Sequence, residues 1–205
     1  MTKSQYISYI KNLLPKIDQT NKYHPNVIAM AVTAAQEQLF NELYRKGELL
    51  EMSQYTSIHS VAKSSAETGW QQLLFSDIGA NPISLERKSG GVDRIVNEEQ
   101  SSTIIYDFKP TTHQEYYRMD TDVHAYYNDV IWYIVEPSRI LVEDKTLLQF
   151  VTNFYVYMIP KFYDHSSTQE FNFPRGHGRL MTQYTLEALG VIRPKDLVSD
   201  NTDTQ

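Results

Sequence analysis

The spacing of the apolar residues changes near residue 50, and this change constrains the fold more than any other feature of the chain. Up to Leu50, apolar residues recur every three or four positions, which is the period of an amphipathic helix. From Tyr55 to Phe173 they form short alternating runs, interrupted by Gly, Pro, Asn and Asp, which is typical of antiparallel strands and their turns. The sequence therefore predicts an α+β protein in which a helical hairpin precedes an antiparallel β-rich domain.

Two helices are expected before residue 50. Thr2 and Gln5 have the spacing of a capping box at the start of the first helix, and Pro15 is expected to stop it. The dipeptide His24-Pro25 is expected to open the second helix, because Pro suits a first turn, and Gly47 is expected to close it. The second helix has a broad apolar face that should be buried against more than one neighbour. Its members are Ile28, Ala31, Val32, Ala34, Ala35, Leu39, Phe40, Leu43 and Tyr44.

A hairpin is the clearest β element of the sequence. Val130–Val135 and Ile140–Glu143 alternate, and the loop that joins them carries Pro at a turn-forming position. A short helical turn is expected at Asp144–Gln149, and a final helix at Gly178–Leu189 with Gly190 as its stop. Further strands are predicted at Tyr55–Val61, Gly91–Val96, Thr103–Phe108 and Asn153–Ile159.

These elements divide the chain into four expected parts. They are an N-terminal helical segment (1–50), a β-rich domain of sandwich or barrel type (51–174), a C-terminal helix (175–195) and an acidic tail (196–205). The tail has too few apolar residues to order by itself, so we expect it to be flexible or to be ordered by a partner.

The composition excludes several classes of protein. With no cysteine, the chain has neither disulfides nor thiolate metal sites, and its core must supply the stability. No stretch approaches the roughly 18 to 20 apolar residues of a membrane span, and polar residues interrupt the first fifteen positions. We therefore expect no membrane anchor and no signal peptide, and synthesis in the cytoplasm.

Negative charge is concentrated in one segment. The net charge is −6, and between Glu98 and Asp129 seven acids face only the two bases Lys109 and Arg118. Proteins that hold nucleic acid by its phosphates usually have a basic face, so this segment argues against such binding. Either it is an ordinary solvated surface, or it is a surface that must not adhere to DNA. The 15 tyrosines would suit protein interfaces, because Tyr offers a large contact area and a hydroxyl.

One segment resembles part of a nuclease site. The apolar run from Ile104 ends in Asp107-x-Lys109, and some metal-dependent nucleases place a carboxylate and an ammonium group on one side of a strand in this way. Asp93, or less plausibly Asp77, would supply the second acid. The triplet is common by chance, however, and Pro110 suggests that the strand simply ends there. A second version of the pattern combines Asp77 with the run Glu86-Arg87-Lys88.

Other chemistry-bearing patterns are incomplete. The six histidines form no closely spaced ligand pair, and Asp120-Thr121-Asp122 lacks the glycine and glutamate of a calcium loop. Gly90-Gly91 lacks the context of a phosphate-binding loop. The sequence therefore predicts no catalytic, cofactor-binding or metal-binding residues, no cofactor and no enzymatic activity.

The N-terminal segment resembles a known group of phage proteins. The run Tyr6–Pro15, followed by Asp18–Pro25 and a long helix, is similar to the start of virion structural proteins of crAss-like phages of gut Bacteroidetes. The similarity extends more loosely to a β-rich middle, a late helix and the ending Pro194–Leu197 before an acidic tail. The resemblance is moderately specific in the opening segment, and it is not specific in the β-rich middle.

The resemblance implies a subunit of the head-to-tail connector. Such a subunit forms a homo-oligomeric ring, a dodecamer if it matches the usual portal, and contacts the portal protein and other connector or tail proteins. The ring lies in the virion, passes double-stranded DNA without binding it specifically, and has no enzymatic role. We expect the acidic segment Glu98–Asp129 to contribute to the channel. The alternatives are a metal-dependent nuclease that uses Asp93, Asp107 and Lys109, and a scaffolding or assembly adaptor that never enters the particle.

Overall fold

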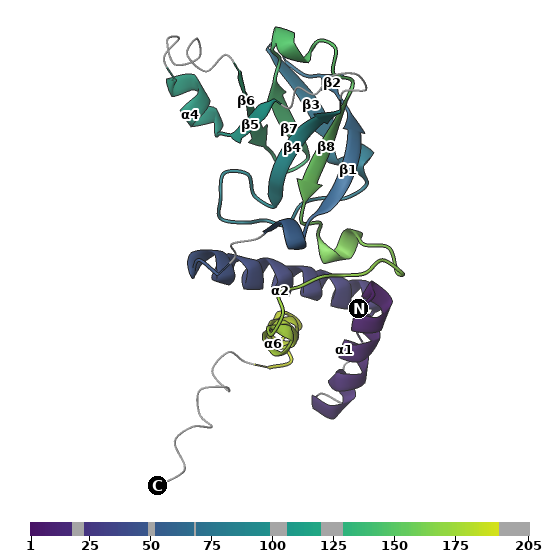
Figure 1. Ribbon diagram of the computed structural model, residues 1–205. Helices are drawn as coiled ribbons and strands as arrows, with labels where there is room; N and C mark the ends of the chain where they lie inside the picture. The colour runs from purple at the N-terminus through teal and green to yellow at the C-terminus, as the bar shows by residue number, and fades with distance from the viewer. Residues whose placement is uncertain (18–22, 49–51, 68, 99–105, 120–128, 193–205) are drawn as a thin grey trace. The chain divides into compact units, whose positions relative to one another are not determined.

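The chain folds into two compact units. The computed structural model describes residues 1–17, 23–48, 52–67, 69–98, 106–119 and 129–192 (Figure 1). A helical unit combines Met1–Leu50 with Lys161–Gln205, and a β-domain comprises Glu51–Pro160. The chain combines helices with an antiparallel and a mixed sheet, and its three longest described helices lie outside the β-domain, which confirms the predicted α+β class. The predicted tail 196–205 lies outside the described residues, as do Asp120-Thr121-Asp122 and residues 18–22 of the opening motif.

The boundary of the β-domain differs from the prediction. It lies at Pro160 and not at residue 174, and the C-terminal helix belongs to the same unit as the N-terminal segment. The residues that follow Pro160 were assigned to the β-rich domain, but they bury Phe162 and Phe171 in one apolar cluster with Tyr6 and Ile10. Burial against distant helices therefore decides where this segment belongs, and the local pattern does not show it.

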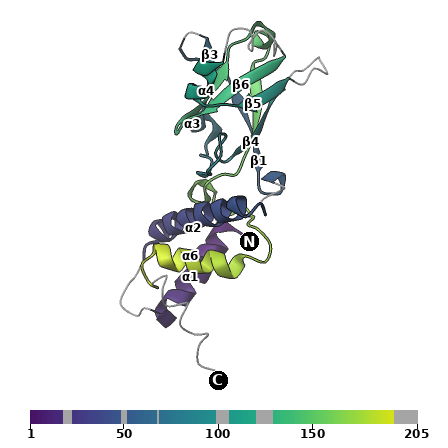
Figure 2. The same cartoon turned by 90° about the vertical axis from the view of Figure 1, so that its left-hand side faces the viewer.

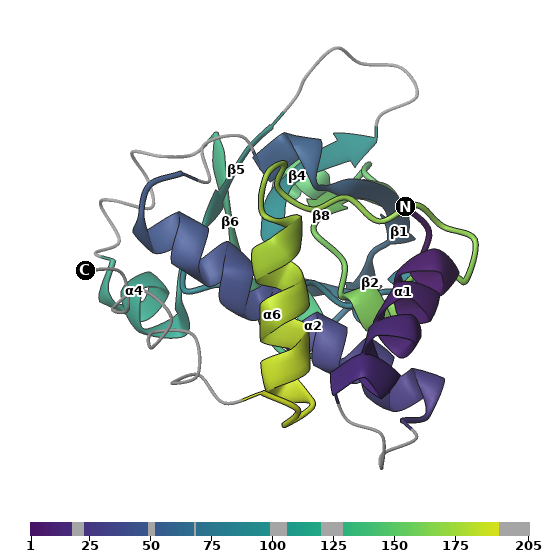
Figure 3. The same ribbon diagram turned by 90° about the horizontal axis from the view of Figure 1, so that it is seen from below.

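The described part of the helical unit contains three helices and a short turn. They are α1 (Lys3–Ile17), α2 (Pro25–Arg45), α6 (Gly178–Ala188) and the 3-10 turn η3 (Phe162–Asp164). Figure 3 shows α6 lying across α2. The apolar residues that they bury together include Tyr6, Ile10, Leu14, Ile28, Val32, Leu39, Leu43, Phe162, Phe171 and Met181.

Local sequence determines most of the helix ends. The capping box is confirmed, because the Gln5 N–H donates to Thr2 Oγ1 (3.3 Å) and the Thr2 N–H donates to Gln5 Oε1 (2.9 Å). The prediction that Pro15 stops α1 is wrong, since the helix continues to Ile17. In the last turn, proline removes its own N–H from the hydrogen-bond ladder but still permits helical residues after it.

The ends of α2 also follow the prediction. Pro25 occupies the first turn, and Nδ1 of His24 accepts the Asn26 N–H at 3.3 Å. At the other end Gly47 has a φ of 70°, and the Glu48 N–H donates to the Leu43 carbonyl at 2.9 Å. This pattern is a Schellman ending, which needs the left-handed conformation that glycine adopts without strain.

The buried face of α2 is close to the predicted one. Seven of the nine predicted residues are buried, whereas Ala34 and Tyr44 are exposed. Ala29 and Gln36 are buried instead. Gln36 is 1% exposed, and its side-chain oxygen accepts the backbone N–H of Phe162 at 2.9 Å. This hydrogen bond joins the segment after Pro160 to the helix, because a buried N–H needs an acceptor.

The described part of the β-domain contains two sheets (Figure 2), and both contribute side chains to a shared core. The smaller sheet is antiparallel, in the order β1 (Ser57–Ala62), β8 (Asn153–Met158) and β4 (Val92–Glu98). The larger has the order β2 (Ser64–Ser65), β3 (Trp70–Leu74), β7 (Arg139–Glu143), β6 (Val130–Val135) and β5 (Asp107–Pro110). The core side chains include Val61, Leu73, Ile95, Ile131, Tyr133, Ile140, Val142, Phe154, Val156 and Met158.

The strand predictions succeed where the pairing is local. The hairpin β6–β7 is confirmed, and β1, β4 and β8 lie within two residues of their predicted ends. In place of the strand predicted at Thr103–Phe108, the structure has β5 at Asp107–Pro110, and residues 103–105 lie outside the described chain. Strand β5 pairs with β6 in parallel, which departs from the expected antiparallel arrangement.

Five elements in the described part of the β-domain were not predicted, namely the 3-10 turn η1 (Met52–Gln54), the two-residue strand β2, β3, α3 (Phe75–Ile78) and α4 (His113–Arg118). Strand β3 has buried residues only at its first and fourth positions, so the sequence does not alternate. The helices α3 and α4 are too short to produce a helical period. The short turn expected at Asp144–Gln149 is confirmed as η2 (Thr146–Leu148).

We predict that Gln36→Leu destabilises the helical unit by about 1–3 kcal/mol, because it leaves the buried N–H of Phe162 without its acceptor. Gln38→Leu is the matched control, since Gln38 is exposed on the same helix and its replacement should change stability by less than about 0.5 kcal/mol. Urea unfolding followed by circular dichroism measures both. Equal effects of the two substitutions would contradict the assigned role of Gln36.

Candidate functional site

A buried carboxylate ties α4 to the larger sheet of the β-domain. Glu143, at the end of β7, is 8% exposed. The Tyr116 hydroxyl donates to its Oε1 (3.1 Å), and the Trp132 N–H donates to its Oε2 (3.3 Å). Lys145 Nζ lies 3.4 Å from the same carboxylate and also donates to the Val130 carbonyl (2.6 Å). A buried charge is tolerated when it is paired and hydrogen-bonded in this way.

Tyr116 is the contact from α4 itself. Its ring lies 4.6 Å, centroid to centroid, from the ring of Trp70 on β3. Burial, and then the neighbouring Glu143 carboxylate, raise the pKa of Tyr116 well above that of a free tyrosine. The hydroxyl therefore stays protonated at neutral pH and remains a donor to Glu143. The start of α4 is fixed separately, because Thr112 and Glu115 form a reciprocal capping box.

The loop between β7 and β8 presents two large apolar side chains to solvent. Leu147 is 38% exposed and Phe150 is 78% exposed, although both lie in a tightly turned segment. We call this pair the Phe150 tip. The Tyr106 hydroxyl donates to the Leu147 carbonyl at 3.2 Å, which fixes the backbone of the tip. Exposed apolar side chains of this size indicate a contact surface when they are gathered on one element.

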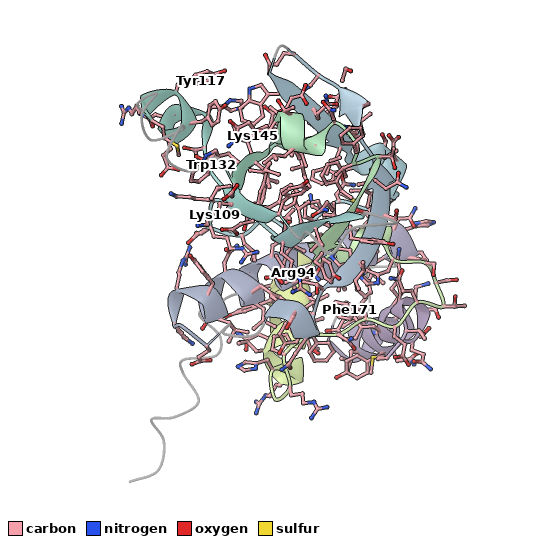
Figure 4. All side chains as sticks on the ribbon, turned by 45° about the horizontal axis from the view of Figure 1, so that its top comes forward. Arg94, Lys109, Tyr117, Trp132, Lys145 and Phe171 are labelled. Carbon is pink, nitrogen blue, oxygen red and sulfur yellow. The ribbon has the colours of Figure 1, made fainter. Side chains whose placement is uncertain are left out.

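A second exposed aromatic residue lies on α4. Tyr117 is 70% exposed, whereas the adjacent Tyr116 faces the sheet. Figure 4 labels Tyr117 on α4, with Trp132 and Lys145 on the neighbouring part of the domain. The β-domain therefore exposes a Tyr on α4 and a Leu and a Phe on the turn after β7, and exposed aromatic side chains favour protein contacts.

The structure brings together only part of the predicted nuclease pattern. Asp107 and Lys109 form an exposed ion pair on β5, with Oδ2 and Nζ 3.2 Å apart. Asp93 lies on β4, in the other sheet, and Asp77 is exposed on α3. Among the described residues, no group of three or more His, Asp and Glu side chains could hold a metal ion. The ion pair is therefore a surface interaction on an edge strand.

The second nuclease pattern has structural roles. Arg87 donates from Nε to the Gly90 carbonyl (2.6 Å) and also donates to the Val92 carbonyl, so it closes the loop before β4. Lys88 Nζ lies 2.6 Å from the Glu115 carboxylate on α4. This ion pair is the first cause that lowers the pKa of Glu115. Neither cation faces Asp77 in a described ion pair.

The negative charge of the chain belongs to the β-domain. Glu51–Pro160 carries 15 Asp and Glu against eight Lys and Arg, whereas the helical unit carries ten against 11. Within the acidic segment, Asp107 and Glu115 are paired with lysines, and Asp129 is exposed. Most of this excess lies in the segment that the sequence singled out, because the rest of the domain carries eight acids against six bases.

Comparisons with known proteins give no relative. No protein-family model matches the chain, and no curated protein sequence matches it. None of the helices in the described part of the chain is both long enough and apolar enough to cross a membrane. The functional assignment therefore depends on the chemistry of the surfaces and on the resemblance of the opening segment.

Sequence reasoning missed both the Glu143 network and the Phe150 tip. Glu143 ends an apolar strand, where an acid usually marks the return to solvent, and only the tertiary structure shows that it is buried. The tip had a visible sign, since the run from Leu147 to Val151 is largely apolar, although its first three residues belong to the short helical turn predicted at Asp144–Gln149. An apolar run in a turn could have been identified as a candidate contact surface.

We predict that Tyr116→Phe destabilises the β-domain by about 1.5–3 kcal/mol, because a hydrogen bond to a buried carboxylate is lost. Tyr117→Phe removes the same hydroxyl from the next residue, where the side chain is exposed, and should have almost no effect. Urea unfolding of the two variants in parallel tests the difference. If Tyr116→Phe unfolds at the wild-type urea concentration, the network does not hold α4 in place.

Proposed function

We propose that the chain is a structural subunit of a tailed-phage virion and forms a homo-oligomeric ring in the head-to-tail connector. The observation that carries the proposal is the combination, in one domain, of excess acid with large apolar side chains exposed on a rigid loop. A connector subunit needs both properties. It must bind its neighbours firmly, and it must allow a polyanion to move past without binding it.

The apolar side chains support self-assembly. A closed ring requires two different surfaces on each subunit, because neighbouring copies are related by a rotation that is repeated around the axis. Exposed Phe, Tyr and Leu side chains supply contact area at low entropic cost. The resemblance of residues 6–25 to virion proteins of crAss-like phages points to the same role, and a portal-matched ring would contain twelve copies.

The charge supports a channel that DNA passes through. Double-stranded DNA binds proteins that replace its counterions with Lys and Arg, so a domain with 15 acids and eight bases offers little affinity. An acidic wall repels the phosphates and lets the duplex slide. We propose that the β-domain, including the segment Glu98–Asp129, contributes to this wall. The partners of the ring would then be the portal protein and the adjoining connector or tail proteins.

The proposal predicts that the chain is present in purified mature particles at about the copy number of the portal protein. Quantitative mass spectrometry of the particles, with the major capsid protein as the internal standard, measures this ratio. A chain that occurs in precursor heads and is lost from mature particles would be an assembly adaptor, and that result would contradict the proposal. Absence from both would contradict it as well.

A further inference from the structure

We propose that neighbouring copies join when the Phe150 tip of one β-domain enters a hollow beside α4 on the next. This inference rests on the proposed ring and names the contact that builds it. The occupant of the hollow is a second copy of the same chain. Three observations lead to this contact: the rigidity of the tip, the apolar lining of the hollow, and the opposite charges beside them.

The tip is held rigid by its neighbours. Leu148 and Val151 are fully buried and anchor the loop on either side of Phe150. The Leu148 N–H donates to the Lys145 carbonyl (2.8 Å), and the Val151 N–H donates to the Leu148 carbonyl (3.0 Å). Lys63 Nζ adds a hydrogen bond to the Leu148 carbonyl at 2.7 Å. A side chain presented by an ordered loop loses little entropy when it binds, so its burial contributes more to affinity.

The hollow has apolar walls and room for an aromatic ring. Pro110, Met119 and Trp132 form its apolar lining, and Lys88, Glu115 and Arg118 are also among its lining residues. Its volume is about 360 Å³. A cavity of about 150 Å³ with apolar walls already admits benzene. A phenylalanine ring therefore fits, and the open side of the hollow allows it to enter from a neighbouring molecule.

The charges beside the two surfaces are complementary. Asp129 shares a shallow pocket with Leu147 and with Lys145, whose ammonium group is already held by Glu143 and the Val130 carbonyl. Asp144 is exposed three positions before Leu147 in the chain. The hollow carries Arg118, which is exposed, and Lys88, which is paired with Glu115 within its own subunit. Arg118 is therefore the main cation available to an acid of the incoming tip. Opposite charges around an apolar contact fix its orientation and favour the correct partner.

The positions of the two surfaces suit a ring. Figure 1 shows the turn between β7 and β8 at the top of the β-domain and α4 at its side. Tip and hollow are thus different patches on one domain. A protrusion on one patch that fits a pre-existing hollow on another makes a head-to-tail contact, which forms a closed ring when the rotation between copies closes.

The first test compares self-association of the purified full-length chain with that of Phe150→Ser, by sedimentation velocity over a concentration series. We expect the variant to associate at least about tenfold more weakly, as truncation of a central aromatic contact does. Ile58→Ser is the matched control, because Ile58 is 59% exposed on β1 of the other sheet and should leave association unchanged. Circular dichroism checks that both variants are folded.

The second test exchanges the charges. Asp144→Arg and Arg118→Asp should each weaken self-association. The double variant should associate more strongly than either, because an arginine at position 144 can then pair with an aspartate at position 118 of the next copy. A mixture of Phe150→Ser with Arg118→Asp should form only dimers, because the intact tip of Arg118→Asp can enter the intact hollow of Phe150→Ser but the reverse contact is lost.

Several results would overturn the inference. They are a wild-type chain that stays monomeric, equal association of Phe150→Ser and Ile58→Ser, and a double charge variant that associates no better than either single variant. The particle measurement decides the proposed function separately. If the chain is in mature particles and Phe150→Ser still associates like wild type, the connector role stands and this contact is wrong. If the tip drives association and the chain is absent from particles, the connector role is wrong.

Discussion

The buried carboxylate of Glu143 connects most of the features of the β-domain that bear on function. To remove a carboxylate from water costs several kcal/mol unless donors replace the lost solvation. Here the hydroxyl of Tyr116, the backbone N–H of Trp132 and the ammonium group of Lys145 replace the lost solvation. These three groups come from α4, from β6 and from the segment after β7. Glu143 would be left unpaired if these groups moved away, and that would cost free energy. The carboxylate therefore keeps three separate segments of the chain in place around it.

This arrangement determines which surfaces the domain can offer. Because Tyr116 faces the sheet, its neighbour Tyr117 faces solvent. The C-terminal end of α4 contributes Arg118 and Met119 to the hollow. Lys145 begins the turn that carries Phe150, and it is held by both Glu143 and the carbonyl of Val130. The tip and the hollow are therefore supported by one hydrogen-bond network. A rigid link between two contact surfaces lets each subunit fix the angle to its neighbours, which a closed ring requires.

The sequence predicted the elements that depend on local chemistry. The capping box at Thr2, the Schellman ending at Gly47 and the hairpin β6–β7 all follow from residues near one another in the chain. It did not predict that β5 pairs in parallel with β6, or that residues 161–174 leave the β-domain, because both depend on contacts between distant segments. Gln36 and Glu143 were missed for the same reason, since a polar residue in a helix or at a strand end gives no local sign of burial. Asp107 and Lys109, singled out as a nuclease pattern, form an exposed ion pair on an edge strand.

We propose that copies of this chain form a ring on the axis of a phage particle, and an image of the particle neck would show whether that ring exists. Electron cryomicroscopy of the neck of purified particles, reconstructed without imposed symmetry, would show the arrangement. The account predicts a closed ring of this chain between portal and tail, with Phe150 of each copy beside Trp132 and Met119 of the next and the acidic β-domain toward the channel. A neck in which no ring has the fold of this chain would contradict it.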